Sequence, residues 1–187
     1  MPAFVLLHGL DGSGPQHWQS WLSQRLTEAG EDVRFPELPD ATDPQPDLWD
    51  EEVRIHIDAA GSDCTVLCHS LACLTWLRLA SATDRQLAAR VALVAPPHTA
   101  EVPAVVRFKP ARLMPKAIHV AAGETRLVWA PDDPFCPGGA AKAWGAPLRI
   151  QGDRIDRGAH LNTDAGYGPW PAIEAWALGR SRQIAPD

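Results

Sequence analysis

The sequence lacks any apolar run near the roughly 18 residues that a membrane-spanning helix requires. Its N-terminus has no basic residues, and its first apolar stretch is too short for a secretory signal peptide. We therefore expect a cytoplasmic protein that does not cross a membrane. No repeat, linker or low-complexity tract divides the 187 residues, which predicts a single domain over residues 1–187.

Positive charge is scarce, because 17 Lys and Arg residues face 23 Asp and Glu residues, for a net charge of −6. Nucleic-acid binding requires a concentrated basic surface, and the bases here are scattered. Only the stretch 107–116 gathers several of them, and we interpret it as a solvated loop face. The composition therefore predicts no nucleic-acid partner.

Cysteine is also sparse, with four residues at positions 64, 68, 73 and 136. Their spacing is not the Cys-x-x-Cys pair of a zinc site, so we expect no bound metal. Three of them fall in a predicted strand and helix, where a free cysteine acts as a small apolar residue. Such usage is typical of a reducing compartment and agrees with a cytoplasmic location.

Short apolar runs alternate with helix-like segments along the chain. Most of the runs are continuously apolar, which is typical of parallel strands covered on both faces. The expected strands are 4–8, 32–35, 64–69, 90–95, 126–130 and 148–151; the expected helices are 16–28, 48–59, 71–81, 138–144 and 169–178. This order predicts the α/β class, with a compact, doubly wound, mostly parallel six-stranded sheet and helices on both faces.

Ser70 lies between the apolar run 64–67 and a helix-like run that begins at Leu71. A serine on a tight turn between a buried strand and a helix is well placed to act as a nucleophile. Such a turn needs small residues two positions before and after the serine, and Cys68 and Ala72 stand there in place of glycine. Serine is also a favoured helix cap, so Ser70 taken alone allows that alternative.

A base and an acid follow Ser70 in the chain order that a catalytic triad on this type of sheet uses. His160 lies in a polar loop after the last expected strand, where it can reach across to Ser70. The acid is Asp132 or Asp133, since either can fix the His160 tautomer by accepting a hydrogen bond. We favour Asp133, directly before Pro134, against the alternative of an Asp-Pro turn with no catalytic part. Together these residues predict nucleophilic catalysis by Ser70.

Backbone N–H groups must stabilise the oxyanion in such a reaction, and Leu10 and Leu71 are the candidates. Leu71 follows the nucleophile, and Leu10 follows the pair His8-Gly9 after the first strand. We expect the His8 ring to hold this loop in shape, the ring of His69 to point away from the pocket, and the other histidines to be structural. The loop 9–14 lacks the Gly-Lys-Ser/Thr ending of a phosphate-binding loop, so no nucleotide or other cofactor is expected.

The sequence resembles the small serine hydrolases of the α/β-hydrolase superfamily that include the retinoblastoma-binding-protein-type and YdeN-type members. The resemblance covers nearly the whole chain and lies in these motifs: His8-Gly9, Gly12-Ser13-Gly14-Pro15, His17-Trp18, His69-Ser70-Leu71, Val94-Ala95-Pro96, Asp133-Pro134-Phe135-Cys136, His160-Leu161-Asn162 and Gly166-Tyr167-Gly168-Pro169-Trp170-Pro171. It implies an α/β-hydrolase fold without a large lid and a triad of Ser70, Asp133 and His160.

Retinoblastoma-type members are named for a Leu-x-Cys-x-Glu segment. The matching stretch here, residues 71–75, ends in threonine and lacks the acid. We also expect this stretch to be the buried start of a helix. Binding of a retinoblastoma-type partner is therefore not expected.

The Pro-rich segment 96–124 interrupts the alternation of strands and helices and is too long for a bare connection. One interpretation places it beside the active site at the carboxyl ends of the strands. The other gives it only a helix of its own. The sequence leaves both open.

We thus expect a serine hydrolase, and most simply a carboxylesterase that cleaves small or short-acyl esters through an acyl-enzyme. A thioesterase or amidase would use the same triad, because the pocket sets the choice. A different alternative is a binding module in which Cys68, Ala72 and Ala159 distort the site. A cysteine nucleophile is excluded, since the centre of the turn is Ser70.

Overall fold

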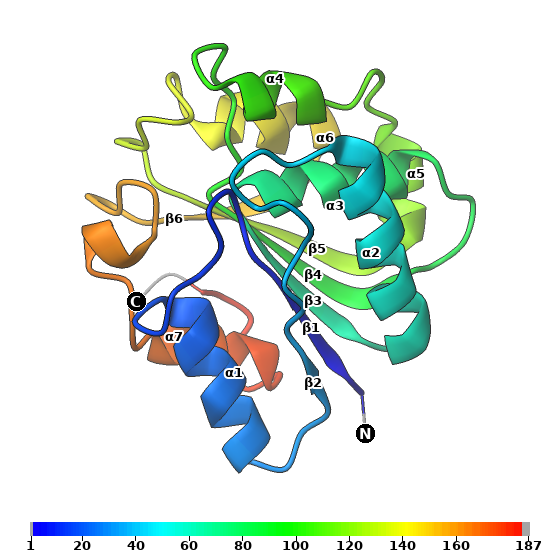
Figure 1. The fold of residues 1–187 in the computed structure, drawn as a ribbon, viewed down its shortest axis with the longest axis vertical. Helices are drawn as coiled ribbons and strands as arrows, with labels where there is room; N and C mark the ends of the chain where they lie inside the picture. Colours follow the sequence, from blue (N-terminus) through cyan, green and yellow to red (C-terminus); the bar gives the residue numbers. More distant parts are fainter. Residues whose placement is uncertain (1, 185–187) are drawn as a thin grey trace.

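A computed structural model describes residues 2–184, and its centre is a single six-stranded sheet (Figure 1). Every adjacent pair of strands is parallel, and their order across the sheet is β2-β1-β3-β4-β5-β6. The strands are β1 (Phe4–Leu7), β2 (Val33–Arg34), β3 (Thr65–His69), β4 (Ala88–Val94), β5 (Ala122–Trp129) and β6 (Gln151–Arg154). The predicted α/β class and doubly wound sheet are confirmed.

Helices cover both faces of the sheet (Figure 1). One face carries α1 (Trp18–Glu28) and α7 (Pro171–Ala177). The other carries α2 (Pro46–Ala60), α3 (Leu71–Ser81), α4 (Pro103–Phe108), α5 (Pro115–Ala121), the π-helix η1 (Ala141–Gly145) and α6 (Ala146–Leu148). A short 3₁₀ helix, η2 (Thr163–Ala165), precedes α7. No helix within residues 2–184 has the length and hydropathy that crossing a bilayer demands.

Helices on both faces of the sheet explain why an inner strand such as β1 is continuously apolar. Side chains of a strand alternate between faces, so Phe4 and Leu6 of β1 pack under α1 and α7. Val5 and Leu7 point the other way and pack under α2 and α3. All four are buried, because helices cover both sides.

The prediction for the last strand was wrong in position. Leu148 is fully buried at the end of α6, and Arg149 takes a left-handed backbone conformation with φ of 57° that ends the helix. The strand β6 follows at Gln151–Arg154 and buries only Asp153. It is an edge strand with a polar sequence, whereas the apolar run just before it belongs to the buried end of α6. The helix expected at 138–144 correspondingly lies later, in η1 and α6.

Both interpretations of segment 96–124 hold. The segment contains α4 and α5, and α5 packs against α3 and leads into β5. Residues of α4 line the cavity at the carboxyl ends of the strands. The side chain of Arg107 anchors α4 there, because it donates to Asp43 at 2.6 Å and to the carbonyl of Pro44 at 3.2 Å.

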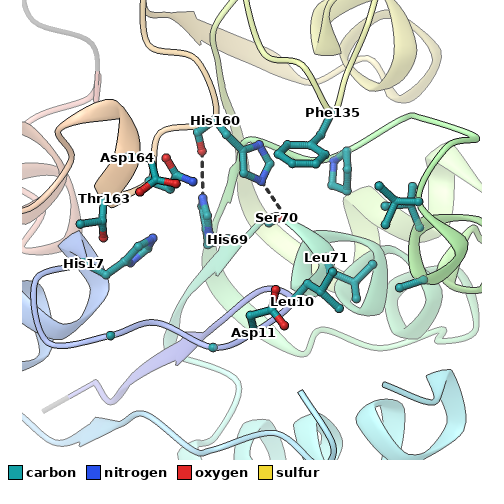
Figure 2. Close-up of a pocket in the computed structure, with 17 residues that line it drawn as sticks. Leu10, Asp11, His17, His69, Ser70, Leu71, Phe135, His160, Thr163 and Asp164 are labelled. Atoms are coloured by element: carbon teal, nitrogen blue, oxygen red, sulfur yellow. Dashed lines mark hydrogen bonds between the residues drawn. The ribbon is translucent and has the colours of Figure 1, made fainter. Parts of the chain in front are cut away.

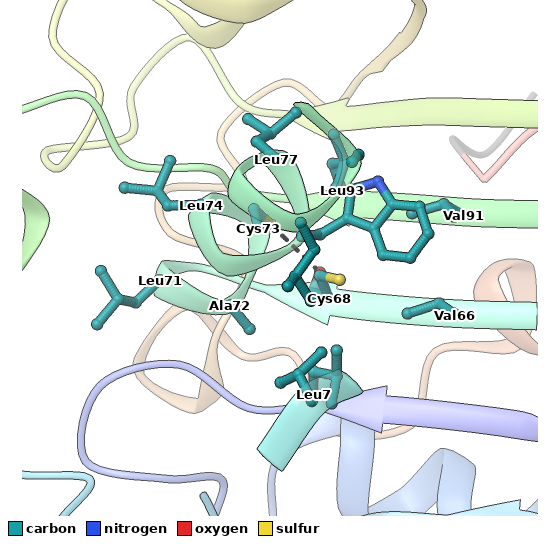
Figure 3. Packing of buried hydrophobic residues seen from close by; sticks show 14 of the residues in the cluster. Leu7, Val66, Cys68, Leu71, Ala72, Cys73, Leu74, Leu77, Val91 and Leu93 are labelled. Atoms are coloured by element: carbon teal, nitrogen blue, oxygen red, sulfur yellow. Dashed lines mark hydrogen bonds between the residues drawn. The ribbon is translucent and has the colours of Figure 1, made fainter. Parts of the chain in front are cut away.

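All four cysteines are buried, and none is bonded to another. Cys68 lies in β3 and Cys73 in α3, packed within the larger apolar core (Figure 3). Cys73 Sγ donates to the carbonyl of Val94 at 3.4 Å. Burial raises the pKa of Cys64 and of Cys136 to about 11, so these thiols stay protonated at neutral pH.

Candidate active site

The site lies where the strand order reverses. The chain places β2 on one side of β1 and β3 on the other, and open α/β sheets bind ligands at such a reversal, beyond the carboxyl ends of the strands. The loop 9–14 leaves the end of β1, and Ser70 leaves the end of β3. The sheet therefore brings these two segments together.

Ser70 has a strained backbone, with φ of 52° and ψ of −121°. Such a conformation is costly for a residue with a Cβ and persists only where its surroundings enforce it. The Ser70 N–H donates to the carbonyl of Val94 at 2.9 Å, which fixes the turn to β4. Although Ser70 occupies the cap position of α3, its side chain makes no capping bond. Its Oγ instead lies 2.8 Å from Nε2 of His160.

Close packing surrounds the turn. Cys68 and Ala72 are fully buried on either side of Ser70. On the facing loop, a methyl group added at Gly9 would lie only 2.7 Å from Cβ of Ser70 and 3.3 Å from its Oγ. Glycine is thus required at position 9 for the loop to approach the serine.

His160 and Asp133 complete a hydrogen-bonded chain with Ser70. Nδ1 of His160 lies 3.0 Å from each carboxylate oxygen of Asp133, so the ring donates there and presents Nε2 to Ser70. The same carboxylate accepts the N–H of Phe135 at 2.9 Å, and Asp133 is only 5% exposed. Asp132 points elsewhere and accepts the N–H of Ala159 at 3.2 Å. Of the two carboxylates, Asp133 is the one in contact with His160.

The N–H groups of Leu10 and Leu71 lie at the two segments that meet beside Ser70. Within residues 2–184, neither N–H donates a hydrogen bond to the protein. Leu71 is the first residue of α3, where N–H groups have no partner inside the helix. Both residues line the cavity, and neither N–H has a partner among the described residues.

The His8 ring ties the loop after β1 to its neighbour. Nε2 accepts the N–H of Leu38 at 2.8 Å, so the hydrogen sits on Nδ1, which donates to the carbonyl of Gly9 at 2.8 Å. Burial lowers the pKa of His8 and favours this neutral form. The expected role in holding the loop agrees with these contacts.

Comparison with known proteins assigns the sequence to a family. The family model described as serine hydrolase matches residues 4–177, which is nearly the whole chain. The chain belongs to the serine hydrolase family. No curated protein matches this serine hydrolase in sequence.

Solved structures agree with the hydrolase fold. The ydeN gene product of B. subtilis is similar at a TM-score of 0.85 and 17% identity, over 96% of this chain and 98% of that one. A YdeN-like hydrolase of Pectobacterium atrosepticum has a TM-score of 0.77 and 22% identity, over 98% and 92% of the two chains. An N-formylmaleamic acid deformylase variant of Pseudomonas putida S16 has a TM-score of 0.66 and 13% identity, over 96% and 92%.

Two histidines of the hydrolase were misjudged from the sequence. His69 does not point away from the pocket: it lines the cavity, and its Nε2 donates to the carbonyl of His160 at 3.0 Å (Figure 2). His17 packs against it with ring centroids 4.8 Å apart and lines the same cavity. Burial, and then the nearby His160, lower the pKa of His69 well below its ordinary value. Two sequence features could have indicated that these histidines lie at the site: His69 is adjacent to Ser70, and His17 belongs to the His17-Trp18 motif.

A cavity of about 390 Å³ opens above Ser70, a size typical of small-molecule sites. His160 forms part of its wall, and the ring of Phe135 lies against the imidazole with centroids 4.5 Å apart. Within residues 2–184, no group of three or more His, Cys, Asp or Glu side chains is arranged to hold a metal ion.

Proposed function

We propose that this hydrolase is a carboxylesterase that cleaves small or short-acyl esters, with Ser70 as nucleophile, His160 as general base and Asp133 as the acid that orients it. The observation that carries the proposal is the unbroken hydrogen-bonded chain from Ser70 Oγ through His160 to Asp133. Nucleophile, base and orienting group within hydrogen-bond reach are the signature of an activated serine.

In the first half of the proposed reaction, Ser70 Oγ attacks the ester carbonyl while His160 Nε2 takes its proton. The N–H groups of Leu10 and Leu71 donate to the oxyanion as the carbonyl carbon becomes tetrahedral. His160 then passes the proton to the leaving oxygen, the C–O bond breaks, and the acyl group remains on Ser70. Asp133 stabilises the imidazolium that forms transiently.

In the second half, water attacks the acyl-enzyme. His160 takes a proton from the water and returns it to Ser70 Oγ when the tetrahedral intermediate collapses. The acid leaves, and the free enzyme is restored with one ester and one water consumed. No cofactor is needed for these steps.

The volume and walls of the cavity support a preference for short acyl groups. Val102 and α4 border a cavity of about 390 Å³, and among residues 2–184 the only helices between β4 and β5 are the short α4 and α5. We propose a small-molecule ester as the substrate and the cytoplasm as the location. Nucleic acid is disfavoured by the net charge of −6. The stretch Leu71–Thr75 is buried in α3, which argues against recognition of it by a retinoblastoma-type partner.

The same residues would serve a thioesterase or an amidase. The deformylase among the similar structures acts, by its name, on N-formylmaleamic acid, so a similar fold accompanies other substrates. A binding module remains the non-enzymatic alternative, but the bond of Ser70 Oγ to His160 argues for an activated serine rather than a distorted site.

The test is a series of p-nitrophenyl esters from acetate to palmitate, run with wild type and Ser70→Ala. We expect kcat/KM to be highest for the esters with short acyl groups. We expect Ser70→Ala to lower kcat/KM by at least about 10³-fold. A butyryl thioester and a butyryl anilide should be slower than the butyrate ester. A maximum of kcat/KM at long acyl groups would refute the short-acyl proposal. Faster hydrolysis of the thioester or the anilide would show that the enzyme is a thioesterase or an amidase.

A further inference from the structure

His69, the last residue of β3, lies between the turn of the nucleophile and the loop of the base. Side chains alternate along a strand, so His69 faces the same side of the sheet as Leu67, toward α1. There its ring packs against His17 and Trp18, with ring centroids 4.8 and 6.0 Å away. His69 is only 5% exposed. This packing fixes the direction in which the ring points.

The contact of His69 with the base fixes its tautomer. Its Nε2 lies 3.0 Å from the main-chain oxygen of His160, and a dashed line marks this bond in Figure 2. A carbonyl oxygen can only accept, so the hydrogen sits on Nε2. Burial, and then the nearby His160 and His17, lower the pKa of His69 well below its ordinary value, which keeps the ring neutral with one N–H. That N–H is donated to the main chain of the base.

The backbone on both sides of His160 is strained and depends on its surroundings. Ala159 and Leu161 take left-handed conformations, with φ of 43° and 50°. Residues with a Cβ keep such conformations only where contacts enforce them. The N–H of Ala159 is held at 3.2 Å by Asp132, which is exposed. The carbonyl of His160 is held by His69, which is buried.

The anchored carbonyl belongs to the residue that carries the imidazole. Because a peptide group is planar, a fixed carbonyl restricts rotation of the backbone at His160 and so the direction of its side chain. The imidazole has to lie 2.8 Å from Ser70 Oγ and 3.0 Å from Asp133 at the same time. Since His69 precedes Ser70 in the chain, one turn carries the nucleophile and also anchors the base.

Building on the esterase function proposed above, we propose that His69 is a positioning residue, which holds the imidazole of His160 within reach of Ser70 by donating to the main chain of His160. His160 takes a proton in both halves of the reaction, from Ser70 and then from water. Loss of the bond therefore slows the formation and the hydrolysis of the acyl-enzyme together. Equal slowing of both steps lowers kcat and leaves KM unchanged.

Three substitutions of His69 separate the hydrogen bond from the volume of the ring. His69→Leu removes the donor, and His69→Asn carries an amide N–H that ends one atom short of the carbonyl. His69→Gln places an amide N–H at about the reach of imidazole Nε2. With p-nitrophenyl butyrate we expect the Leu and Asn variants to lower kcat by about 10²-fold at unchanged KM. His69→Gln should stay within about fivefold of wild type, because the bond is kept.

His119→Leu is the matched control. Nε2 of His119 also lies 3.0 Å from a main-chain carbonyl, that of Leu148, but His119 does not line the cavity. This variant should keep the wild-type kcat. Circular dichroism establishes which variants are folded at the assay temperature. Nitrogen-15 NMR of the wild-type imidazoles needs no substitution, and it should show His69 neutral with its hydrogen on Nε2.

A double-mutant cycle separates positioning of the base from general support of the fold. His160→Ala keeps the main-chain carbonyl and removes the imidazole, so only the residual rate supported by the backbone donors remains. If His69 acts through the imidazole, adding His69→Leu should change this residual kcat/KM by less than about threefold. A further loss of about 10²-fold would show that His69 supports Ser70 or the fold instead, and would overturn the inference.

Wild-type kcat in folded His69→Leu or His69→Asn would also overturn it, as would a loss in folded His69→Gln as large as that in His69→Leu. A hydrogen on Nδ1 of His69, or a charged ring, would do so without any variant. Absence of p-nitrophenyl butyrate hydrolysis in the wild type would overturn the esterase function and this inference together. Hydrolysis that is insensitive to the His69 substitutions would overturn this inference alone.

Discussion

Two adjacent carboxylates in the turn that follows β5 have very different surroundings. Asp133 is 5% exposed and contacts His160 through both oxygens, while Asp132 is exposed and accepts only the N–H of Ala159. An asparagine at position 133 would present an amide that favours the wrong imidazole tautomer. We expect Asp133→Asn to lower kcat by about 10³- to 10⁴-fold.

Asp132→Asn is the matched control for this substitution. It should leave kcat within about threefold of the wild-type value, because it changes a single hydrogen bond that is not part of the Ser70–His160–Asp133 hydrogen-bond network. Steady-state kinetics with a short p-nitrophenyl ester measures both variants. Equal losses would show that neither carboxylate has the orienting role that we assign to Asp133.

Gly9 gives a second prediction, because it packs directly against the nucleophile Ser70. A methyl group there would lie 2.7 Å from Cβ of Ser70, so the loop carrying Leu10 or the turn carrying Ser70 must shift. A displacement of this kind costs about 10²-fold in rate. We expect Gly9→Ala to lower kcat by about 10²-fold.

Thermal unfolding followed by circular dichroism provides the control for Gly9→Ala. Overpacking costs about 1–3 kcal/mol, which a folded protein tolerates at assay temperature. A variant that stays folded and keeps wild-type kcat would show that the close approach of this loop is unimportant for the reaction.

The edge strand β6 is held to β5 by a buried ion pair. Nη2 and Nε of Arg126 donate to the two oxygens of Asp153 at 2.6 and 2.7 Å, and the carboxylate also accepts the N–H of Ile184. Removing one partner of such a pair leaves an uncompensated charge. We expect Arg126→Met to lower the free energy of unfolding by about 3 kcal/mol.

Arg154→Met is the control for the β6 prediction. Arg154 pairs with Asp156 at 2.8 Å, but these side chains are 59% and 72% exposed. Exposed pairs contribute about 0–1 kcal/mol, so its loss should be small. Urea denaturation of both variants makes the comparison, and similar losses would contradict a structural role for the buried pair.

The elements of this fold were predictable to the extent that they are buried. The sequences of β1 and β3 are continuous, largely apolar runs because helices cover both faces of these strands. The sequence QGDR of β6 carries no such signal, since the strand lies at the edge and only Asp153 is buried. Burial of Leu148 drew the prediction three residues too early.

The juxtaposition of Ser70, Asp133 and His160 was predictable for a different reason. Parallel strands end at one edge of a sheet, so residues directly after them meet there whatever their separation in sequence. The pairing of His69 with the His160 carbonyl follows no such rule. The accepting carbonyl lies between Ala159 and Leu161, whose left-handed conformations, with φ of 43° and 50°, are not evident from the sequence.

The stability of the whole molecule should depend on pH through its buried neutral histidines. Burial, and then the nearby His160 and His8, lower the pKa of His17 from 6.5 to about 4 in the folded protein. Between these values the unfolded chain binds more protons, so this contribution is complete above pH 6.5 and is lost as the pH falls toward 4. His69 shifts in the same direction.

We therefore expect the thermal midpoint to fall as the pH is lowered from 6.5 to 4, and the fall to be shallower in His17→Asn. Each histidine accounts for at most about 1.4 kcal/mol per pH unit. Differential scanning calorimetry at several pH values measures both slopes. Identical slopes would mean that His17 is not held neutral by the fold.

The central claim is that the fold activates Ser70 through His160, and labelling with a fluorophosphonate probe tests it most directly. The account predicts a single adduct, located on Ser70 by mass spectrometry, and no adduct in folded Ser70→Ala or His160→Ala. Failure of folded wild-type protein to react, or an adduct that survives in Ser70→Ala, would contradict the account.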